Sequence, residues 1–303
     1  MDGRDGENPA IQRLRLRTEL RRARVNVGRT QKSVAQAMEW SPSKLLRIEA
    51  GEVGISINDL RSLLALYSVT DEAEVDILLA LARGSRKMPL SEYRDLFSKD
   101  FFDFLALESA ASEIRIFEPL AIPGLLQTEE YAAEIIETYT PDWYSNEQKS
   151  RMIEARMLRQ ESLNRDYVDS FFIMDESVIR RQMGGLAVMQ KQLRRLAELA
   201  AHPRRHIMIY PFSEGNHPAS LSPFTLFDFA EGLDPYLYFE SPRRTYTVER
   251  VTKQYPRYFE IFAGLEEKSI GGDRVPRILR QVADGLGLKP KDFAAPESDE
   301  FSS

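Results

Sequence analysis

The sequence predicts two domains of different classes: a mainly α domain of five short helices, then an α+β domain with a helix-covered sheet. Apolar residues recur at helical spacing through roughly the first 85 residues, whereas short runs of branched and aromatic residues begin near residue 114. Between these regions, residues 84–92 mix Gly, Ser, Lys and Pro without apolar periodicity. We therefore expect domains at residues 1–86 and 93–285, followed by a polar, disordered tail at residues 286–303.

Helix-start and helix-stop residues place the first three helices of the N-terminal domain. Pro9 is suited to the first turn of a helix that ends near Val25, because a first-turn residue needs no N–H partner. Thr30 and Ser41 are suited to cap the second and third helices, and Gly51 to end the third. The fourth and fifth helices are marked by apolar residues at helical spacing: Ile57, Leu60, Leu63, Leu64 and Tyr67, then Val75, Leu78, Leu79 and Leu81.

The second domain alternates strand-like and helix-like segments. The predicted strands are residues 114–118, 168–174, 206–210, 223–229 and 236–240. A capped helix start is predicted at Thr128, and further helices are predicted at residues 147–163, 175–183, 186–201 and 247–267. This alternation favours a sheet with helices packed against it.

Composition excludes several functional classes. The chain has no Cys, which excludes disulfides, thiolate nucleophiles and cysteine-ligated metal sites, and its three His leave little for a metal centre. No apolar run approaches the roughly 20 residues of a membrane span, and the start of the chain lacks the apolar core of a signal peptide. We therefore expect a cytoplasmic protein without a metal or other cofactor.

The net charge of −6 divides unevenly along the chain. Residues 1–90 carry 15 Lys and Arg against 12 Asp and Glu, a balance of +3, which leaves 26 against 35, or −9, for residues 91–303. Within residues 11–50 the count is 10 basic against 3 acidic residues, or +7. A basic run alone is often a solvated helix face, so a second observation is needed to indicate a nucleic-acid partner.

Residues 30–51, TQKSVAQAMEWSPSKLLRIEAG, supply that observation because they have the pattern of a helix-turn-helix. Two helices that cross steeply need a small residue where they touch, and Ala35 is placed for this contact. With Leu45 and Ile48 buried, the third helix must turn its other side outward. The outward residues are Ser41, Pro42, Ser43, Lys44 and Arg47, which are candidates for the major-groove surface.

This segment resembles the Cro/CI-type, or XRE, family of transcriptional regulators. The matching residues are Thr30, Gln31, Val34, Ala35, Ser41, Leu45, Arg47, Ile48, Glu49 and Gly51. Leu46 departs from the pattern, since a small polar residue is frequent there. The DNA-contacting residues that we expect are Thr30, Gln31, Lys32, Ser41, Ser43, Lys44 and Arg47.

The resemblance also implies roles for single residues. Gln31 is expected to approach the DNA backbone, and Glu49 to pair internally with Arg17, Arg21 or Arg24 of the first helix. The alternatives are that Gln31 is merely solvated and that Lys44 and Arg47 contact only phosphates, which position a protein without reading sequence. Trp40 is expected to pack at the turn.

The second domain resembles the C-terminal domain of a large actinobacterial group of these regulators. The resemblance is carried by the runs at residues 123–132, 175–185, 188–203 and 210–220. It implies no settled activity, although several members look like antitoxin-type or developmental regulators encoded beside a small partner protein. A partner protein of this kind is therefore one expectation for the present chain.

Three features of the second domain are candidate functional sites. Asp175 and Glu176, near Arg180 and Arg181, have the chemistry for acid–base catalysis, but an acidic pair after a strand more often caps the next helix and pairs with nearby Arg on the surface. His217 lies in a loop, where a lone His is usually solvated. We expect no catalysis. A partner or ligand surface is assigned to Phe224, Phe227, Phe229, Tyr236 and Tyr238, although alternation along strands makes a hydrophobic core the simpler explanation.

Taken together, the sequence predicts a sequence-specific DNA-binding transcriptional regulator that acts as a homodimer on a double-stranded operator, with a C-terminal domain that receives a signal or a small protein. The alternative is an antitoxin-type interaction protein that binds a small partner and regulates its own operon. A lesser alternative is an enzyme fused to a DNA-binding module.

Overall fold

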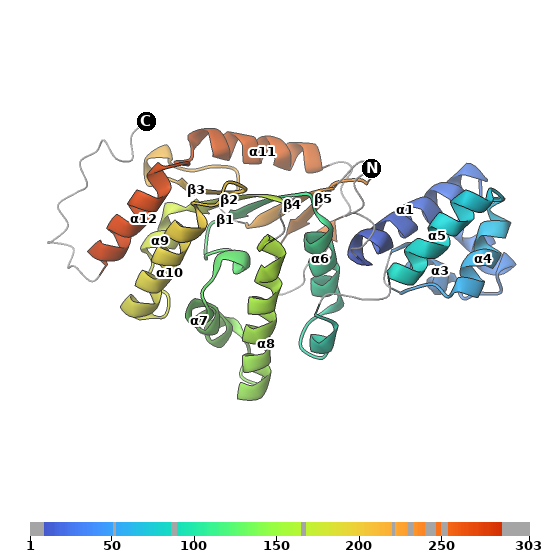
Figure 1. Ribbon diagram of the computed structural model, residues 1–303, viewed down its shortest axis with the longest axis horizontal. Helices are drawn as coiled ribbons and strands as arrows, with labels where there is room; N and C mark the ends of the chain where they lie inside the picture. The colour runs from blue at the N-terminus through green and yellow to red at the C-terminus, as the bar shows by residue number, and fades with distance from the viewer. Residues whose placement is uncertain are drawn as a thin grey trace. The chain divides into compact units, whose positions relative to one another are not determined.

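The computed structural model describes residues 9–50, 53–85, 90–164, 168–219, 222–229, 233–239, 247–249 and 254–286 (Figure 1). The chain forms two compact units, of which the first takes in residues up to Ser91 together with Phe102–Ala110. The second comprises most of the remainder, including the whole sheet. The sequence places the boundary within residues 84–92 and Phe102–Ala110 in the second domain, whereas the latter residues group with the first unit. The tail predicted at residues 286–303 lies outside the described residues after Leu286.

The five helices predicted for the N-terminal unit are confirmed. They are α1 (Pro9–Asn26), α2 (Gln31–Ala37), α3 (Pro42–Glu49), α4 (Ile57–Leu66) and α5 (Glu72–Gly84). Side-chain caps begin three of them, because the oxygens of Thr30, Ser56 and Asp71 accept from backbone N–H groups in the first turns of α2, α4 and α5. The stop predicted at Gly51 lies outside the described residues, and Ala50 caps α3 in right-handed helical conformation.

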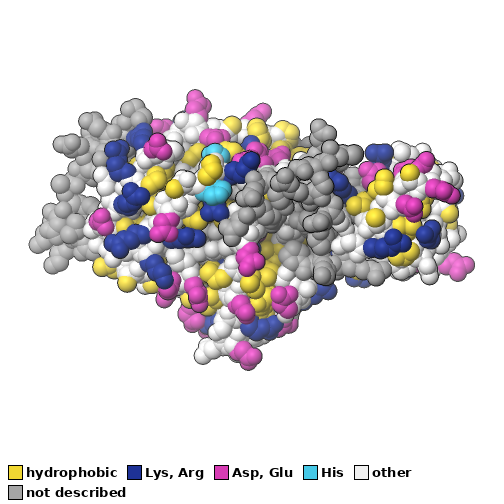
Figure 2. Space-filling view, in the orientation of Figure 1, with side chains coloured by type: hydrophobic (Ala, Val, Ile, Leu, Met, Phe, Trp, Pro, Cys, Tyr) yellow, Lys and Arg dark blue, Asp and Glu magenta, His cyan; other side chains and the backbone are white. Residues whose placement is uncertain are grey.

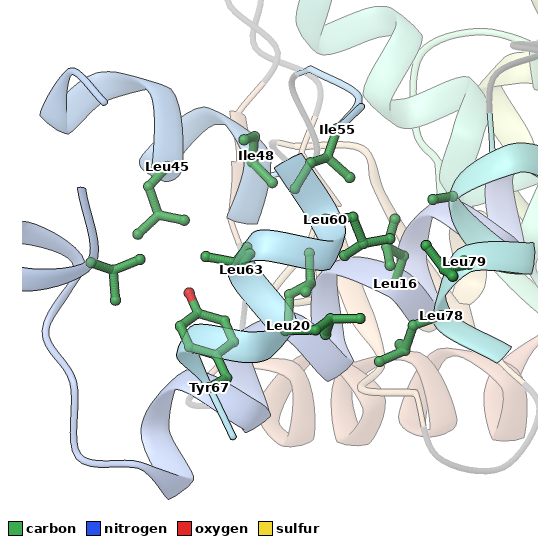
Figure 3. Close-up of a cluster of buried hydrophobic side chains, with 13 residues drawn as sticks. Leu16, Leu20, Leu45, Ile48, Ile55, Leu60, Leu63, Tyr67, Leu78 and Leu79 are labelled. Carbon is green, nitrogen blue, oxygen red and sulfur yellow. The ribbon is translucent and has the colours of Figure 1, made fainter. Parts of the chain in front are cut away.

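One apolar core holds these helices together (Figure 3). Each of these five helices contributes to it, and its buried residues are Leu16, Leu20, Val34, Leu45, Ile48, Ile55, Leu60, Leu63, Leu64, Tyr67, Leu78, Leu79 and Ala82. Leu20, Leu45 and Leu60 are completely buried. Because residues three and four apart share one face of a helix, the apolar spacing seen in the sequence brings these side chains to the same interior.

The second unit is built on a six-stranded sheet in the order β3-β2-β1-β4-β5-β6. Its strands are β1 (Glu113–Glu118), β2 (Asp169–Asp175), β3 (Arg205–Tyr210), β4 (Phe224–Asp228), β5 (Tyr236–Phe239) and β6 (Thr247–Glu249). The strands β1, β2 and β3 are parallel, whereas β4, β5 and β6 each run antiparallel to their neighbours. The five predicted strands are therefore confirmed.

The sixth strand corrects the helix predicted for residues 247–267. Residues 247–249 pair with β5 in the antiparallel register Leu237↔Glu249, and helix α11 (Tyr255–Lys268) begins only at Tyr255. Thr247 and Val248 are β-branched, which suits a pleated strand with a neighbour to pair with. The predicted helix therefore starts eight residues before the helix in the structure.

Helices cover both faces of this sheet (Figure 1). On one face α11 packs Phe262 and Leu265 into a core that includes Phe117, Ile173 and Leu226. On the other side lie α7 (Glu129–Tyr139), α8 (Asn146–Arg159), α9 (Glu176–Arg180) and α10 (Gly185–Leu199), and α12 (Arg274–Gly285) packs against α10. The remaining helices are α6 (Lys99–Ala110) and the 3-10 turns at Ser91–Tyr93, Gly124–Leu126, Gln160–Asn164 and Phe212–Glu214. No described helix has both the length and the apolar character that a membrane crossing requires.

Candidate nucleic-acid interface

Helices α2 and α3 form the predicted helix-turn-helix. The turn between them has Glu39 at φ 55°, and the backbone N–H of Trp40 donates to the carbonyl of Ala35 over 2.8 Å. Ala35 is 1% exposed, as expected for a small residue at a close crossing. Trp40 is half-buried and packs against the apolar core, which confirms its predicted place at the turn.

A buried ionic contact ties the end of α3 to α1. Glu49 is 4% exposed and accepts two hydrogen bonds from Arg24, Nε to Oε1 over 2.6 Å and Nη2 to Oε2 over 3.0 Å. The expected internal pairing of Glu49 is thus confirmed, with Arg24 as the partner. This hydrogen bond raises the pKa of Arg24, so the guanidinium stays charged. The paired and buried Glu49 therefore ties the C-terminal end of α3 to α1.

Gln31 belongs to the same contact. Its side-chain N–H donates to Oε2 of Glu49 over 2.8 Å, and the residue is half-buried. Its expected approach to the DNA backbone therefore requires either a second hydrogen bond from the amide or the release of Glu49. Sequence spacing alone did not show this bond, because it joins residues from two helices.

The remaining predicted DNA contacts divide by exposure. Thr30, Lys32, Ser41, Ser43 and Arg47 are exposed, whereas Lys44 is half-buried. Ser41 has the backbone conformation of an N-cap, but its side chain makes no capping hydrogen bond, which corrects one expectation. The N–H of Lys44 instead donates to the backbone carbonyl of Ser41 over 2.9 Å, and the Ser41 hydroxyl lies 3.2 Å from that of Ser43.

Lys44 is engaged within the protein. Its ammonium group lies 3.0 Å from Oδ2 of Asp59, at the start of α4, and 4.0 Å from the centre of the Trp40 ring. Both contacts hold the ammonium group beside the start of α4 and the Trp40 ring. Arg47, one turn further along α3, is exposed. The visible face of the N-terminal unit carries a group of basic side chains with separate acidic ones (Figure 2).

The acidic pair weighed as a catalytic site has structural contacts. Asp175 caps α9 by accepting from the N–H of Ser177 over 2.8 Å, which confirms the capping interpretation. Glu176 pairs with Arg180, but it is 4% exposed rather than a surface residue, and it also accepts from the backbone N–H of Phe212 over 2.9 Å. The bond to Phe212 connects α9 to the turn that follows β3, and these contacts engage Oδ1 of Asp175 and both oxygens of Glu176.

His217 is not a solvated loop residue. It is half-buried between the rings of Phe117 and Tyr210, with centroids 4.9 and 4.6 Å away. Burial lowers the pKa of His217, so the neutral imidazole is favoured in the folded chain.

The aromatic surface assigned to the second domain is corrected. Phe224, Phe227, Tyr236 and Tyr238 are at most 3% exposed, and Phe229 is half-buried. They belong to the interior, because the side chains on both faces of β4 and β5 are largely buried. Among the described residues, the exposed aromatic side chains lie elsewhere, in Trp143 (81%), Tyr139 (60%), Phe212 (55%) and Phe259 (40%). No periodic pattern marks these positions in the sequence.

Sequence reasoning also missed a polar cluster on the α11 face of the sheet. Arg115 pairs with Glu113 and with Asp228, the latter over 2.9 Å, and lies between the rings of Phe171 and Phe259. The Tyr255 hydroxyl donates to the same Asp228. Burial raises the pKa of Glu113 despite the neighbouring Arg115. The cluster joins β1, β4 and α11, and only the sheet register brings its members together.

Comparison with known protein families gave two matches. Residues 101–281 match the family described as a domain of unknown function (DUF5753), and residues 15–78 match a helix-turn-helix domain. No curated protein and no solved structure gives a significant match to the chain. The second match spans α2 and α3 and most of the basic stretch at residues 11–50.

Proposed function

The chain belongs to the DUF5753 family and carries a helix-turn-helix domain, and from this premise we propose that it is a sequence-specific, Cro/CI-type (XRE) transcriptional regulator that acts in the cytoplasm. The observation that carries the proposal is the recognition helix: Leu45 and Ile48 bury one side of α3, while Ser43 and Arg47 project from the other. A helix held in this way can place side chains against base edges in the major groove.

Charge supports the assignment of DNA binding to the N-terminal unit. Residues 11–50 carry +7, which favours contact with phosphates, whereas residues 91–303 carry −9. The C-terminal unit is therefore proposed to bind something other than DNA.

The test is selection by the full chain from a library of duplexes with a randomised central region, followed by sequencing. A regulator enriches one motif reproducibly, and the double variant Lys44→Ala plus Arg47→Ala loses that enrichment. A chain that retains duplex DNA without enriching any motif contradicts sequence-specific regulation. Unchanged enrichment by the double variant contradicts the assignment of α3 as the recognition helix.

We further propose that two copies bind one operator. Each chain contributes one recognition helix, and such units reach specific affinity by spanning two half-sites about one helical turn apart. Sedimentation of the full chain with a two-site duplex is expected to give two chains per duplex. Affinity is expected to fall when half a helical turn is inserted between the sites. Binding as one chain per duplex with no dependence on spacing contradicts the dimer.

Binding of a small protein is proposed as a second function of the C-terminal unit, as in an antitoxin-type regulator. The exposed Trp143 and Tyr139 favour it, since exposed aromatic residues often anchor protein interfaces. Affinity purification of the full chain from its native host is expected to recover one small protein, and Trp143→Ala is expected to reduce its recovery relative to Phe212→Ala. Recovery of no protein contradicts this function and does not affect the proposal of DNA binding.

We propose no catalytic activity, because the carboxylates of Asp175 and Glu176 serve helix capping and packing.

A further inference from the structure

Leu46 is an exposed apolar residue in the recognition helix. It is 53% exposed, whereas its neighbours Leu45 and Ile48 are 0% and 4% exposed. Leu46 lies one turn after Pro42 and three residues after Ser43, so these side chains adjoin on the outer side of α3. Packing within the unit does not require a large apolar side chain at this position.

The groups around Leu46 restrict what it can contact. The exposed polar side chains of α3 are those of Ser43 and Arg47, whereas Lys44 is half-buried and contacts Asp59 and the Trp40 ring. Leu46 itself neither donates nor accepts hydrogen bonds. The apolar group that a standard base pair presents in the major groove is the 5-methyl group of thymine.

We propose that Leu46 recognises a thymine by packing against its 5-methyl group, and so determines part of the operator sequence. The inference rests on the proposed function, since it assumes that α3 enters the major groove. It assigns specificity at one base pair to an apolar contact beside the polar contacts of Ser43 and Arg47. The base beside Leu46 is then thymine rather than cytosine, adenine or guanine.

The test uses the full chain and the motif that it selects from the randomised duplex library. Each thymine of the motif is replaced singly by uracil, which lacks the methyl group and keeps the same hydrogen-bonding groups. Wild-type affinity is expected to fall about fourfold at one thymine of each half-site, the effect of losing one buried methyl group. Leu46→Ser is expected to bind the thymine and uracil duplexes equally at that position, and Leu46→Met to retain the preference for thymine.

Control measurements separate this contact from loss of structure. Ile77→Ser replaces another exposed apolar residue of the N-terminal unit, 61% exposed in α5, and is expected to leave affinity and the thymine preference unchanged. Circular dichroism is expected to show that both serine variants keep the helical content of the wild type, because neither position is buried.

The outcomes distinguish the two proposals. If the wild type enriches no motif, sequence-specific binding itself is overturned. A second outcome is that the wild type enriches a motif while every uracil replacement changes its affinity by the same factor as that of Leu46→Ser. That result leaves the proposal of sequence-specific regulation intact and overturns the thymine contact. A change of oligomeric state in Leu46→Ser without any uracil effect also overturns it, since Leu46 is then a contact between protein chains.

Discussion

The guanidinium group of Arg24 in α1 holds the carboxylate of Glu49 at the end of α3 through two hydrogen bonds, of 2.6 and 3.0 Å. The side chain of Arg24 is 12% exposed and that of Glu49 is 4% exposed. The end of α3 is therefore joined to α1 by a charge pair that is largely withdrawn from water.

Removal of one member of this pair is expected to destabilise the N-terminal unit strongly. Glu49→Ala leaves Arg24 buried without its carboxylate, which should lower the free energy of unfolding by about 3–5 kcal/mol. The control is Glu19→Ala, because Glu19 pairs with Arg22 on the surface over 3.6 Å, and such a pair contributes about 0–1 kcal/mol.

The measurement is urea unfolding followed by Trp40 fluorescence. The chain has two Trp, so a Trp143→Phe background leaves Trp40 as the reporter of the N-terminal unit. Equal losses of stability in Glu49→Ala and Glu19→Ala would show that the buried pair adds nothing beyond a surface pair.

Two hydroxyl residues at helix starts are expected to differ in their contribution to stability. The Thr30 side chain accepts from the N–H of Ser33 over 3.1 Å, whereas the Ser41 side chain makes no capping bond. Thr30→Ala should lower the free energy of unfolding by about 1 kcal/mol, and Ser41→Ala by less than about 0.5 kcal/mol. Thermal unfolding of the two variants compares them directly, and a larger loss in Ser41→Ala contradicts the capping pattern.

Arg47 is expected to matter more than Lys44 for recognition. If Arg47 contacts a base edge, Arg47→Ala should weaken binding to the selected motif by about 1–3 kcal/mol. The variant should also show a smaller difference in affinity between the motif and an unrelated duplex. Lys44→Ala should cause a smaller loss that is the same for both duplexes, because Asp59 and Trp40 hold the ammonium group. Fluorescence anisotropy titrations at fixed salt measure both. A loss of discrimination confined to Lys44→Ala reverses the two roles.

Binding is expected to weaken steeply with salt. Each neutralised phosphate releases counterions, so log affinity should fall against log salt with a slope near −0.9 per phosphate contact. Lys32→Ala should make this slope shallower by about one, since Lys32 is exposed and is one of the predicted DNA-contacting residues. Titrations between low and physiological salt give the slope. An affinity that does not change with ionic strength would mean that the basic stretch at residues 11–50 does not contact DNA phosphates.

The stability of the C-terminal unit is expected to fall below neutral pH because of His217. Burial lowers its folded-state pKa below the ordinary value of 6.5, so the unfolded chain binds a proton that the folded chain does not. The stabilisation is present above pH 6.5 and is lost as the pH falls from there to the lowered folded-state value.

A His217→Gln variant removes this titration and leaves His202 and His206 in place. Urea unfolding at pH 7.5 and 5.5 should therefore show a greater loss of stability in the wild type than in the variant. An identical pH dependence in the two proteins contradicts the effect of burial at His217.

Local sequence patterns were sufficient for much of the fold. The five N-terminal helices follow from apolar spacing with polar start residues such as Thr30, and the first five strands follow from runs of branched and aromatic residues. These features depend on interactions between residues close in the chain, so a short window of sequence contains their causes. The start of α11 was misplaced because β6 forms only through its pairing with β5, a partner outside that window.

By itself, the sequence determined which helix has one buried side and which residues of that helix can face outward. Leu45 and Ile48 are apolar at helical spacing, and this pattern specifies the inner side of α3 before any partner is known. Tertiary structure alone decided which of the residues assigned to binding surfaces are exposed and which contact other parts of the protein. Lys44 is drawn to Asp59, Gln31 bonds to Glu49, and Phe224 and Tyr236 are covered in the sheet, because each meets a partner contributed by another element of the fold. Such contacts depend on how elements pack in three dimensions, and the periodicity of one segment contains no information about the groups that another segment brings to it.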